Sequence, residues 1–175
     1  MISALLLSPS LAAAAPDPRA AEALARSLGA LVRATMEGVV RDAALIGPAA
    51  DDLAAVADYA GCAYVEAATL GDGLPRALSD TRGDIVFVLE GGFAPPHGFI
   101  EEASDLLLEG AAFAGALLRR APYNLATRLA PGLARPVGLL APRGALRAVQ
   151  ARDLPALIRA VKPRRSLNIQ AIRTI

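Results

Sequence analysis

The side chain best placed for chemistry in this sequence is a single acid that follows an apolar run. Glu90 comes directly after Ile85–Leu89 and is followed by Gly91 and Gly92. Open α/β sheets bind their ligands just beyond the carboxyl ends of the strands, and a carboxylate there can hold Mg²⁺ or Mn²⁺. One carboxylate is rarely sufficient for such an ion. Glu90 is therefore either a remaining metal ligand or an ordinary loop residue.

Other reactive side chains lack the partners that catalysis would require. His97 is the only histidine and follows two prolines, where a histidine is typically solvated or forms a cap. Cys62 is the only cysteine, so no intrachain disulfide can form, and we interpret it as a small apolar residue of the interior. Ser8 and Ser10 do not belong to a nucleophile motif, and no glycine-rich phosphate loop occurs.

Short apolar runs alternate with helical patterns along the chain, and these elements must position any site. We predict strands over residues 2–7, 39–47, 62–67, 85–89, 111–118, 136–142 and 166–172. We predict helices over residues 17–34, 52–60, 74–80, 98–109, 122–130, 143–149 and 153–161. The run 111–118 is also compatible with a helix. Such alternation predicts one three-layer α/β/α domain over residues 1–175 with a mostly parallel sheet.

The first 16 residues, MISALLLSPSLAAAAP, allow two interpretations. The run 2–7 is typical of a buried first strand, whereas an apolar run followed by small residues is also found in signal peptides. No Lys or Arg precedes the run and Pro9 interrupts it, which favours the strand. The sequence has no stretch of 18 uninterrupted apolar residues, so we predict no membrane-spanning helix.

Charge is distributed unevenly, although the formal net charge is only +1. Residues 1–110 contain 6 Arg and 16 Asp or Glu, whereas residues 111–175 contain 11 Arg, Lys162 and one acid, Asp153. The arginines could pair with the acidic part of the chain. They could instead form a basic surface that binds lipid phosphates or an acidic protein.

We expect a cytoplasmic protein that could also attach peripherally to a membrane through this basic C-terminal third. The expected partner is an acidic protein or an anionic membrane surface, and a homo-oligomer is compatible with the sequence. Nucleic acid is not expected, because the basic run 162–165 (KPRR) belongs to no known binding motif and aromatic residues make up only 4% of the chain.

The ordered set of strands and turns resembles the glycosyltransferase family 2 domain, a GT-A fold that handles nucleotide-sugars. The first strand ends in LSPS (7–10), where the family has an apolar strand followed by Pro-Thr. The stretch 39–52 resembles the second strand and its Asp-rich turn, and 82–92 stands where the family has Arg-Gly-Glu, a buried strand and Asp-X-Asp. FAPPHGFIEEA (93–103) resembles the Pro-Pro-Gly-Trp-Ile-Glu run, and 137–149 resembles the strand and helix near the acceptor site.

The resemblance assigns roles to five residues by position. Pro9, Ser10 and Asp51 would lie at the nucleotide, and Asp51 is also placed to cap the helix over 52–60. Glu90 would be the first acid of the metal-binding motif. Asp153 is the only acid near the position of the family's catalytic base.

Three positions that carry the family's chemistry depart from its pattern. The acid that holds the base of the nucleotide is replaced by Ile46 or Gly47. The Asp-X-Asp triplet reads Glu90-Gly91-Gly92, which has one acid where the family has two. The family's Glu-Asp pair before the basic turn is reduced to Asp153.

We therefore predict a degenerate glycosyltransferase family 2-like protein that has lost metal-dependent sugar transfer and needs no cofactor. It would serve as a binding or partner-supporting module and not as an enzyme. The alternative is an active glycosyltransferase that uses a nucleotide-sugar donor with a reduced acidic site, or with groups from a partner chain. Mg²⁺ or Mn²⁺ would be its cofactor.

Overall fold

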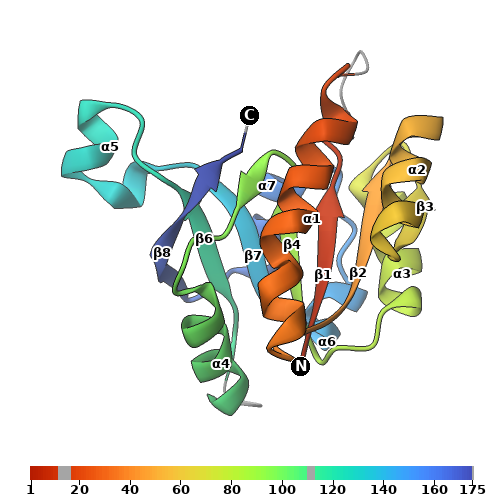
Figure 1. Ribbon diagram of the computed structural model, residues 1–175. Helices are drawn as coiled ribbons and strands as arrows, with labels where there is room; N and C mark the ends of the chain where they lie inside the picture. Colours follow the sequence, from red (N-terminus) through yellow and green to blue (C-terminus); the bar gives the residue numbers. More distant parts are fainter. Residues whose placement is uncertain (12–16, 110–112, 175) are drawn as a thin grey trace.

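A mixed β-sheet forms the centre of the structure, and its strands alternate with helices along the chain (Figure 1). The computed structural model describes residues 1–11, 17–109 and 113–174. The strands are β1 (Ile2–Leu7), β2 (Val40–Gly47), β3 (Ala63–Glu66), β4 (Ile85–Glu90), β5 (Phe93–Ala94), β6 (Ala116–Arg120), β7 (Pro136–Pro142) and β8 (Arg165–Arg173). The helices are α1 (Ala20–Met36), α2 (Asp51–Ala60), α3 (Leu70–Asp80), α4 (Phe99–Glu109), α5 (Leu125–Leu129), α6 (Arg143–Arg147), α7 (Leu154–Val161) and the 3₁₀ helix η2 (Pro131–Leu133).

The strand order is β3-β2-β1-β4-β7-β6-β8-β5. Strands β1, β2, β3 and β4 are parallel to their neighbours in this group, and β6 is parallel to β8. Strand β7 runs antiparallel between β4 and β6, and β5 is antiparallel to β8. Because β6 is antiparallel to β7, it points the same way as β4. The sheet is therefore mostly parallel, which confirms the predicted fold class.

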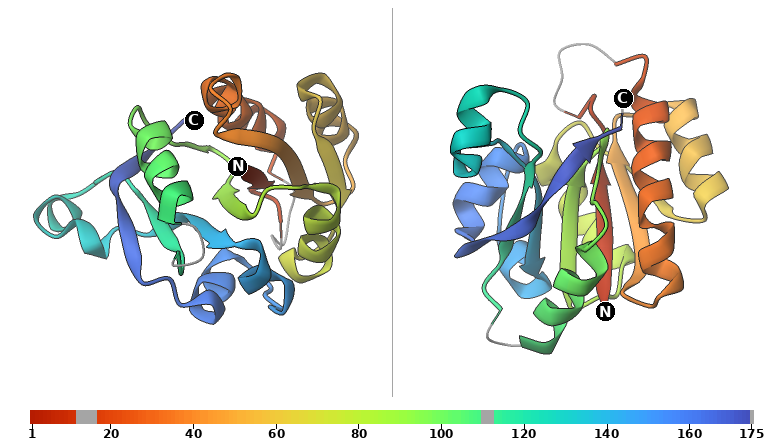
Figure 2. Two further views of the ribbon diagram at one scale, coloured as in Figure 1. Left: turned by 90° about the horizontal axis from the view of Figure 1, so that it is seen from below. Right: turned by 60° about the vertical axis from the view of Figure 1, so that its left-hand side comes forward.

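Helices cover both faces of the sheet and complete the three predicted layers. Helices α1, α2 and α4 lie on one face, and α3, α6 and α7 lie on the other (Figure 2). Side chains of β1 alternate between the two faces: Ile2, Ala4 and Leu6 pack under the first group of helices, and Leu5 and Leu7 under the second. Burial on both faces explains why such strands read as continuous apolar runs.

The structure corrects the predicted ends of several elements. Residues 2–7 form a strand in the middle of the sheet, as the strand interpretation predicted. Helix α1 begins at Ala20 instead of residue 17, after a turn in which the backbone N–H of Ala20 donates to the carbonyl of Asp17. Strand β6 begins at Ala116; residues 111 and 112 of the predicted strand lie outside the described residues.

A polar network holds the turn at the amino end of β4. The N–H of Gly83 donates to Ser3 Oγ at 2.7 Å, and the Ser3 hydroxyl donates to Asp42. Arg143 Nε donates to the carbonyl of Gly83 at 2.7 Å, and burial lowers the pKa of the Arg143 guanidinium. A Cβ on Gly83 would lie 2.5 Å from the backbone N of Ser3, so only glycine fits this turn.

Among the described residues, we find no helix with the length and apolarity that crossing a bilayer requires.

Candidate functional site

The candidate site is the carboxyl edge of β1, β2 and β4, because the predicted site residues Pro9, Ser10, Asp51 and Glu90 lie at or just after the ends of these strands. Leu7 of β1 lies beside Glu90 of β4 in the register of the sheet. The N–H of Gly91 donates to the carbonyl of Leu7 at 2.8 Å, and the N–H of Ser8 donates to the carbonyl of Ile46 at 2.8 Å. The first bond joins the end of β4 to that of β1, and the second joins the end of β1 to that of β2.

Glu90 is engaged by a cation from the basic third of the chain. Nη2 of Arg135 lies 2.7 Å and 2.9 Å from the two carboxylate oxygens of Glu90. Arg135 directly precedes β7, the antiparallel neighbour of β4. The side chain of Glu90 is 23% exposed and that of Arg135 is 55% exposed, so water reaches the pair. A guanidinium therefore lies against the carboxylate that resembles the family's metal ligand.

The two glycines after Glu90 pack closely against other parts of the chain. A Cβ on Gly91 would lie 2.9 Å from the carbonyl of Leu7 and 3.0 Å from Pro9. Gly92 has a φ of 87°, a conformation that side chains other than glycine disfavour. Its N–H donates to the hydroxyl of Ser27, a fully buried residue of α1, at 3.0 Å. The glycines thus have structural reasons to occupy these positions.

No cluster of ligands surrounds Glu90 in the part of the chain that the structure describes. Within residues 1–11, 17–109 and 113–174, no three His, Cys, Asp or Glu side chains could hold a metal ion together. Metal binding by Glu90 would require displacement of Arg135 and a second oxygen ligand. The metal role of Glu90 stays a hypothesis.

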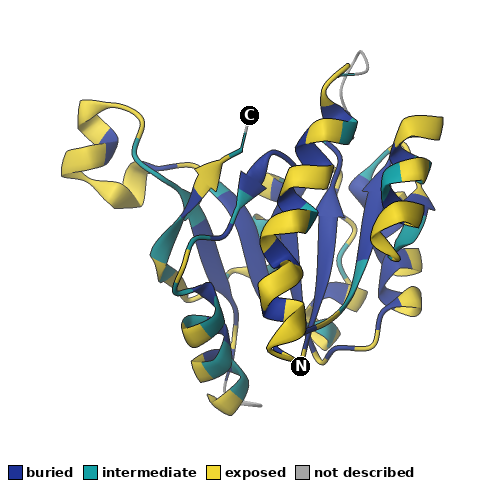
Figure 3. Cartoon of the chain, in the orientation of Figure 1, coloured by how far each residue is buried: buried dark blue, intermediate teal, exposed yellow. Residues whose placement is uncertain are grey.

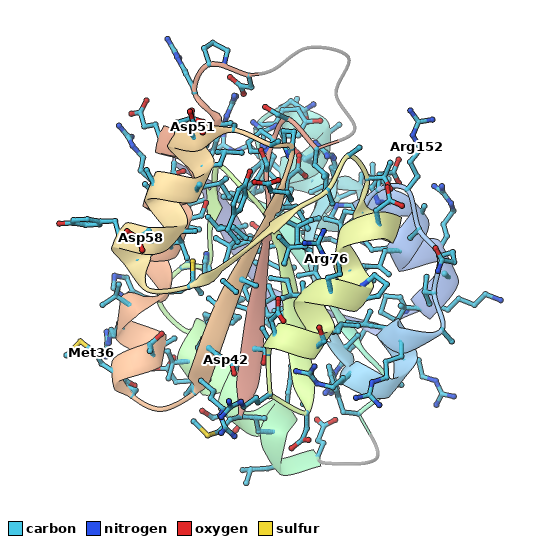
Figure 4. The ribbon with its side chains drawn as sticks, turned by 90° about the vertical axis from the view of Figure 1, so that its right-hand side faces the viewer. Met36, Asp42, Asp51, Asp58, Arg76 and Arg152 are labelled. Atoms are coloured by element: carbon cyan, nitrogen blue, oxygen red, sulfur yellow. The ribbon has the colours of Figure 1, made fainter. Side chains whose placement is uncertain are left out.

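The three positions expected at a nucleotide follow β1 and β2, and one of them, Ser10, uses its hydroxyl within its own loop. Pro9 is half-buried, and the buried hydroxyl of Ser10 accepts from the N–H of Asp17 at 2.8 Å. Asp51 is exposed at the start of α2 and lies toward the upper edge in Figure 4. The prediction that Asp51 caps this helix is wrong. Helix α2 begins at Asp51 itself, and its N-cap is Ala50. Nucleotide binding by these residues stays a prediction.

The strand end that holds the base in the family is apolar here and tightly packed. Ile46 is fully buried, and its Cγ2 would lie 2.5 Å from a Cβ on Gly73 of α3. A Cβ on Gly47 would lie 3.0 Å from both Ser8 Cβ and Leu53 Cδ1. Neither residue can offer a side-chain acceptor to a nucleotide base.

Asp153 has a structural use that accounts for its carboxylate. It is the N-cap of α7, where its Oδ1 accepts from the N–H of Ala156 at 2.8 Å. Helix caps of this kind stabilise a helix by about 1 kcal/mol. A catalytic role for Asp153 stays a prediction that no observed contact supports.

His97 lies as expected, whereas Cys62 is less buried than the sequence predicted. His97 is exposed, in agreement with the expectation of a solvated loop residue. Cys62 is half-buried, and burial raises the pKa of its thiol to about 11. It lines a groove of about 810 Å³ between α1 and α2, on a mostly apolar surface that also includes Val32, Met36 and Tyr59.

Sequence reasoning missed Arg135 as a residue of this edge. Arg135 and Glu90 are 45 positions apart, and no local motif connects them. The excess of arginine in the last third was the only signal that could have suggested the pair.

Comparison with known proteins identifies the fold. No protein-family model and no curated protein matches this chain. Among solved structures, glucosyl-3-phosphoglycerate synthase from Mycobacterium tuberculosis in complex with phosphoglyceric acid gives a TM-score of 0.62 at 18% identity, over 98% of this chain and 71% of that one. The same enzyme with Mn²⁺, uridine diphosphate and phosphoglyceric acid gives 0.59 at 19% identity, over 94% and 66%. A further mycobacterial protein gives 0.62 at 19% identity, over 98% and 64%.

These likenesses define the class to which the fold belongs. The chain has a GT-A-like fold of the kind seen in glycosyltransferases. It spans about two thirds of the length of these proteins. At these identities the likeness concerns the fold alone, and activity is a matter for proposal.

Proposed function

We propose that this protein is a glycosyltransferase-like binding module that has lost metal-dependent sugar transfer. The observation that carries the proposal is the ion pair between Glu90 and Arg135. In the glycosyltransferase family 2 pattern, this edge supplies two acids to a divalent cation. Here the first position faces a guanidinium, and the third is Gly92, whose positive φ disfavours replacement by most side chains.

A second candidate function is supported by the same ion pair. Arg135 brings a fixed positive charge to the edge where a metal would neutralise a leaving diphosphate. Guanidinium groups bind phosphate through charge-assisted hydrogen bonds and can stabilise charge that develops in a transition state. The chain would then be a glycosyltransferase that uses a nucleotide-sugar donor without a metal. We rank this function second, because a transferase needs a base that deprotonates the acceptor hydroxyl. The only candidate for that base, Asp153, is engaged as the N-cap of α7.

Calorimetry with uridine diphosphate and UDP-glucose, each with and without Mn²⁺, separates these functions. The binding-module proposal predicts no binding tighter than the millimolar range in any of the four titrations. Micromolar binding that requires Mn²⁺ would overturn it. Micromolar binding without metal, weakened in Arg135→Ala but not in the control Arg41→Ala, would support the metal-free transferase.

Electron paramagnetic resonance of Mn²⁺ gives an independent measurement of the metal site. The wild-type chain should leave the spectrum of free Mn²⁺ unchanged. The combined changes Glu90→Asp, Gly92→Asp and Arg135→Ala restore an Asp-Gly-Asp triplet and remove the competing cation. Because Asp tolerates a positive φ better than most side chains do, this variant should bind Mn²⁺ measurably once circular dichroism has shown that it is folded. Equal binding by the wild type would contradict the loss of the metal site.

The binding surface of such a module would lie in the basic C-terminal third. Two ion pairs between described residues connect this third to the acidic part of the chain: Arg135 with Glu90, and Arg165 with Glu109. These pairs involve only two of the 11 arginines that follow residue 110, and both pairs are partly exposed. The proposed partner therefore carries anionic groups that bind these arginines. Its binding should weaken as salt is added, because exposed charges are screened.

A further inference from the structure

A lobe between β6 and β7 projects from the sheet and shares little of the core. This α5–η2 lobe comprises residues 121–135 and stands apart from the helical layers in Figure 1. Within it only Thr127 and Ala134 are buried, and Figure 3 shows its helices almost entirely in the colour of exposed residues. Its shape is maintained locally by a capping box, in which the N–H of Thr127 donates to Asn124 Oδ1 at 2.9 Å.

The lobe exposes large apolar side chains instead of burying them. The exposed fractions are 71% for Leu125, 79% for Leu129 and 71% for Leu133, and Tyr123 is 58% exposed. Three leucines gathered on one small projection form a surface that is unfavourable in water and typical of an interaction site.

The charged residues of the lobe itself, Arg128 and Arg135, are both positive, and Arg135 is paired with Glu90 at the edge of the sheet. Arg128 is exposed on α5, and the guanidinium of Arg120 lies 4.3 Å from the centre of the Tyr123 ring. The sequence has no acid between Glu109 and Asp153. The exposed leucines of the lobe therefore lie next to arginines in a segment of the sequence that contains no acid.

We propose that the α5–η2 lobe docks on an anionic membrane surface, with its leucines inserted among the lipids and its arginines at the phosphates. Apolar side chains beside cationic ones are the pattern of interfacial membrane segments, in which arginine extends its charged head to the phosphate level. Tyrosine is enriched at the same depth. Charge complementarity selects an anionic bilayer over a neutral one. The inference is independent of the nucleotide site, so either proposal can fail alone.

Tryptophan fluorescence tests the insertion directly, because the sequence contains no tryptophan. Leu129→Trp places a single fluorophore on the lobe, and Tyr59→Trp places one on the exposed face of α2 as a control. With phosphatidylcholine vesicles that contain phosphatidylglycerol, the emission of Leu129→Trp should shift to the blue, and that of Tyr59→Trp should not. Phosphatidylcholine alone should give no shift. Unshifted emission of Leu129→Trp with the anionic vesicles would overturn the proposal.

Co-sedimentation with the same vesicles separates the two contributions to binding. The combined change of Leu125, Leu129 and Leu133 to Ser should lower partitioning at least about tenfold, because leucine burial is lost. Arg128→Glu should lower it roughly tenfold at low salt and less at high salt. The matched controls are Val32→Ser with Met36→Ser, and Arg41→Glu, which should bind as the wild type does. Circular dichroism checks that each variant is folded.

Three further results would overturn the proposal. The first is unchanged sedimentation of the leucine variant, and the second is equal binding to neutral and anionic vesicles. The third is a blue-shifted emission of Leu129→Trp without vesicles together with a doubled mass in solution, which would assign the lobe to contact with a second copy of the chain.

Discussion

The two ends of β4 differ in how completely their polar groups are bonded. At the amino end, Ser3 and Gly83 are buried and exchange hydrogen bonds with Asp42 and Arg143. At the carboxyl end, the side chain of Glu90 is bonded to Arg135 in an ion pair that water reaches. Figure 4 shows Asp42 toward one edge of the molecule and Asp51 toward the opposite edge, where the candidate site lies.

This difference indicates that the stability of the fold depends more on the polar network at the amino end of β4 than on the ion pair at its carboxyl end. Leaving a buried donor without its acceptor costs about 1–3 kcal/mol, whereas an exposed ion pair contributes about 0–1 kcal/mol. Substitution of the Glu90 or Arg135 side chain should therefore change little in stability, and an acid can be lost at this position while the fold is kept. The amino end has no such freedom.

The largest effect is expected from Gly83→Ala. Its new Cβ would lie 2.5 Å from the Ser3 nitrogen and 2.8 Å from the Ile2 carbonyl carbon, both backbone atoms of a central strand. We expect the free energy of unfolding to fall by about 3 kcal/mol in urea denaturation. The control Gly144→Ala in α6 meets nothing within 4 Å and should be neutral or stabilising by up to about 1 kcal/mol. Equal stability of the two variants would contradict the packing described for the turn.

A smaller loss is expected from Ser3→Ala. The change removes the acceptor of the Gly83 N–H and a donor to Asp42, in a place that water does not reach. Unfolding free energy should fall by about 2 kcal/mol. The exposed Ser79→Ala provides the comparison and should stay within about 0.5 kcal/mol of the wild type. A loss at Ser3 no larger than at Ser79 would mean that the amino end is no more constrained than the surface.

The carboxyl end should respond weakly. Glu90→Ala and Arg135→Ala should each lower the unfolding free energy by less than about 1 kcal/mol, and a double-mutant cycle should give a coupling energy below about 1 kcal/mol. Added salt should reduce the coupling further, because the pair is partly exposed. A coupling of several kcal/mol would show that this end is as tightly constrained as the other and would remove the contrast.

The smallest effect on stability is expected from ionisation of the Cys62 thiol, which does not occur at neutral pH. Burial raises the pKa of its thiol from 9.0 to about 11, so the neutral thiol is favoured in the folded chain. The resulting stabilisation is fully present below pH 9 and is lost as the pH rises through about 11. Alkylation by iodoacetamide should accordingly be slow at pH 8 and rise with a midpoint near pH 11 while circular dichroism shows a folded chain. A midpoint near 9 would contradict the burial of the thiol.

Sequence patterns alone identified most of the fold, for a physical reason. Strands such as 2–7 and 136–142 are buried on both faces and so appear as continuous apolar runs, and Gly61 marks the end of α2 because it adopts a positive φ of 65°. The two-residue strand β5 could not be predicted, because it exists only through pairing with Ile172 and Arg173 at the far end of the chain.

Tertiary structure alone decided the surroundings of the site and of the lobe. The helical pattern of residues 122–130 was recognised in the sequence, but leucines such as Leu125 and Leu129 at helical spacing normally indicate a core. Their exposure follows from where the chain leaves the sheet after β6, which no local pattern encodes. In the same way, Glu90 was found from its place after a strand, whereas its contact with Arg135 depends on the antiparallel pairing of β4 and β7. Contacts between distant segments arise only when the sheet assembles, and those contacts decide what each of these side chains can do.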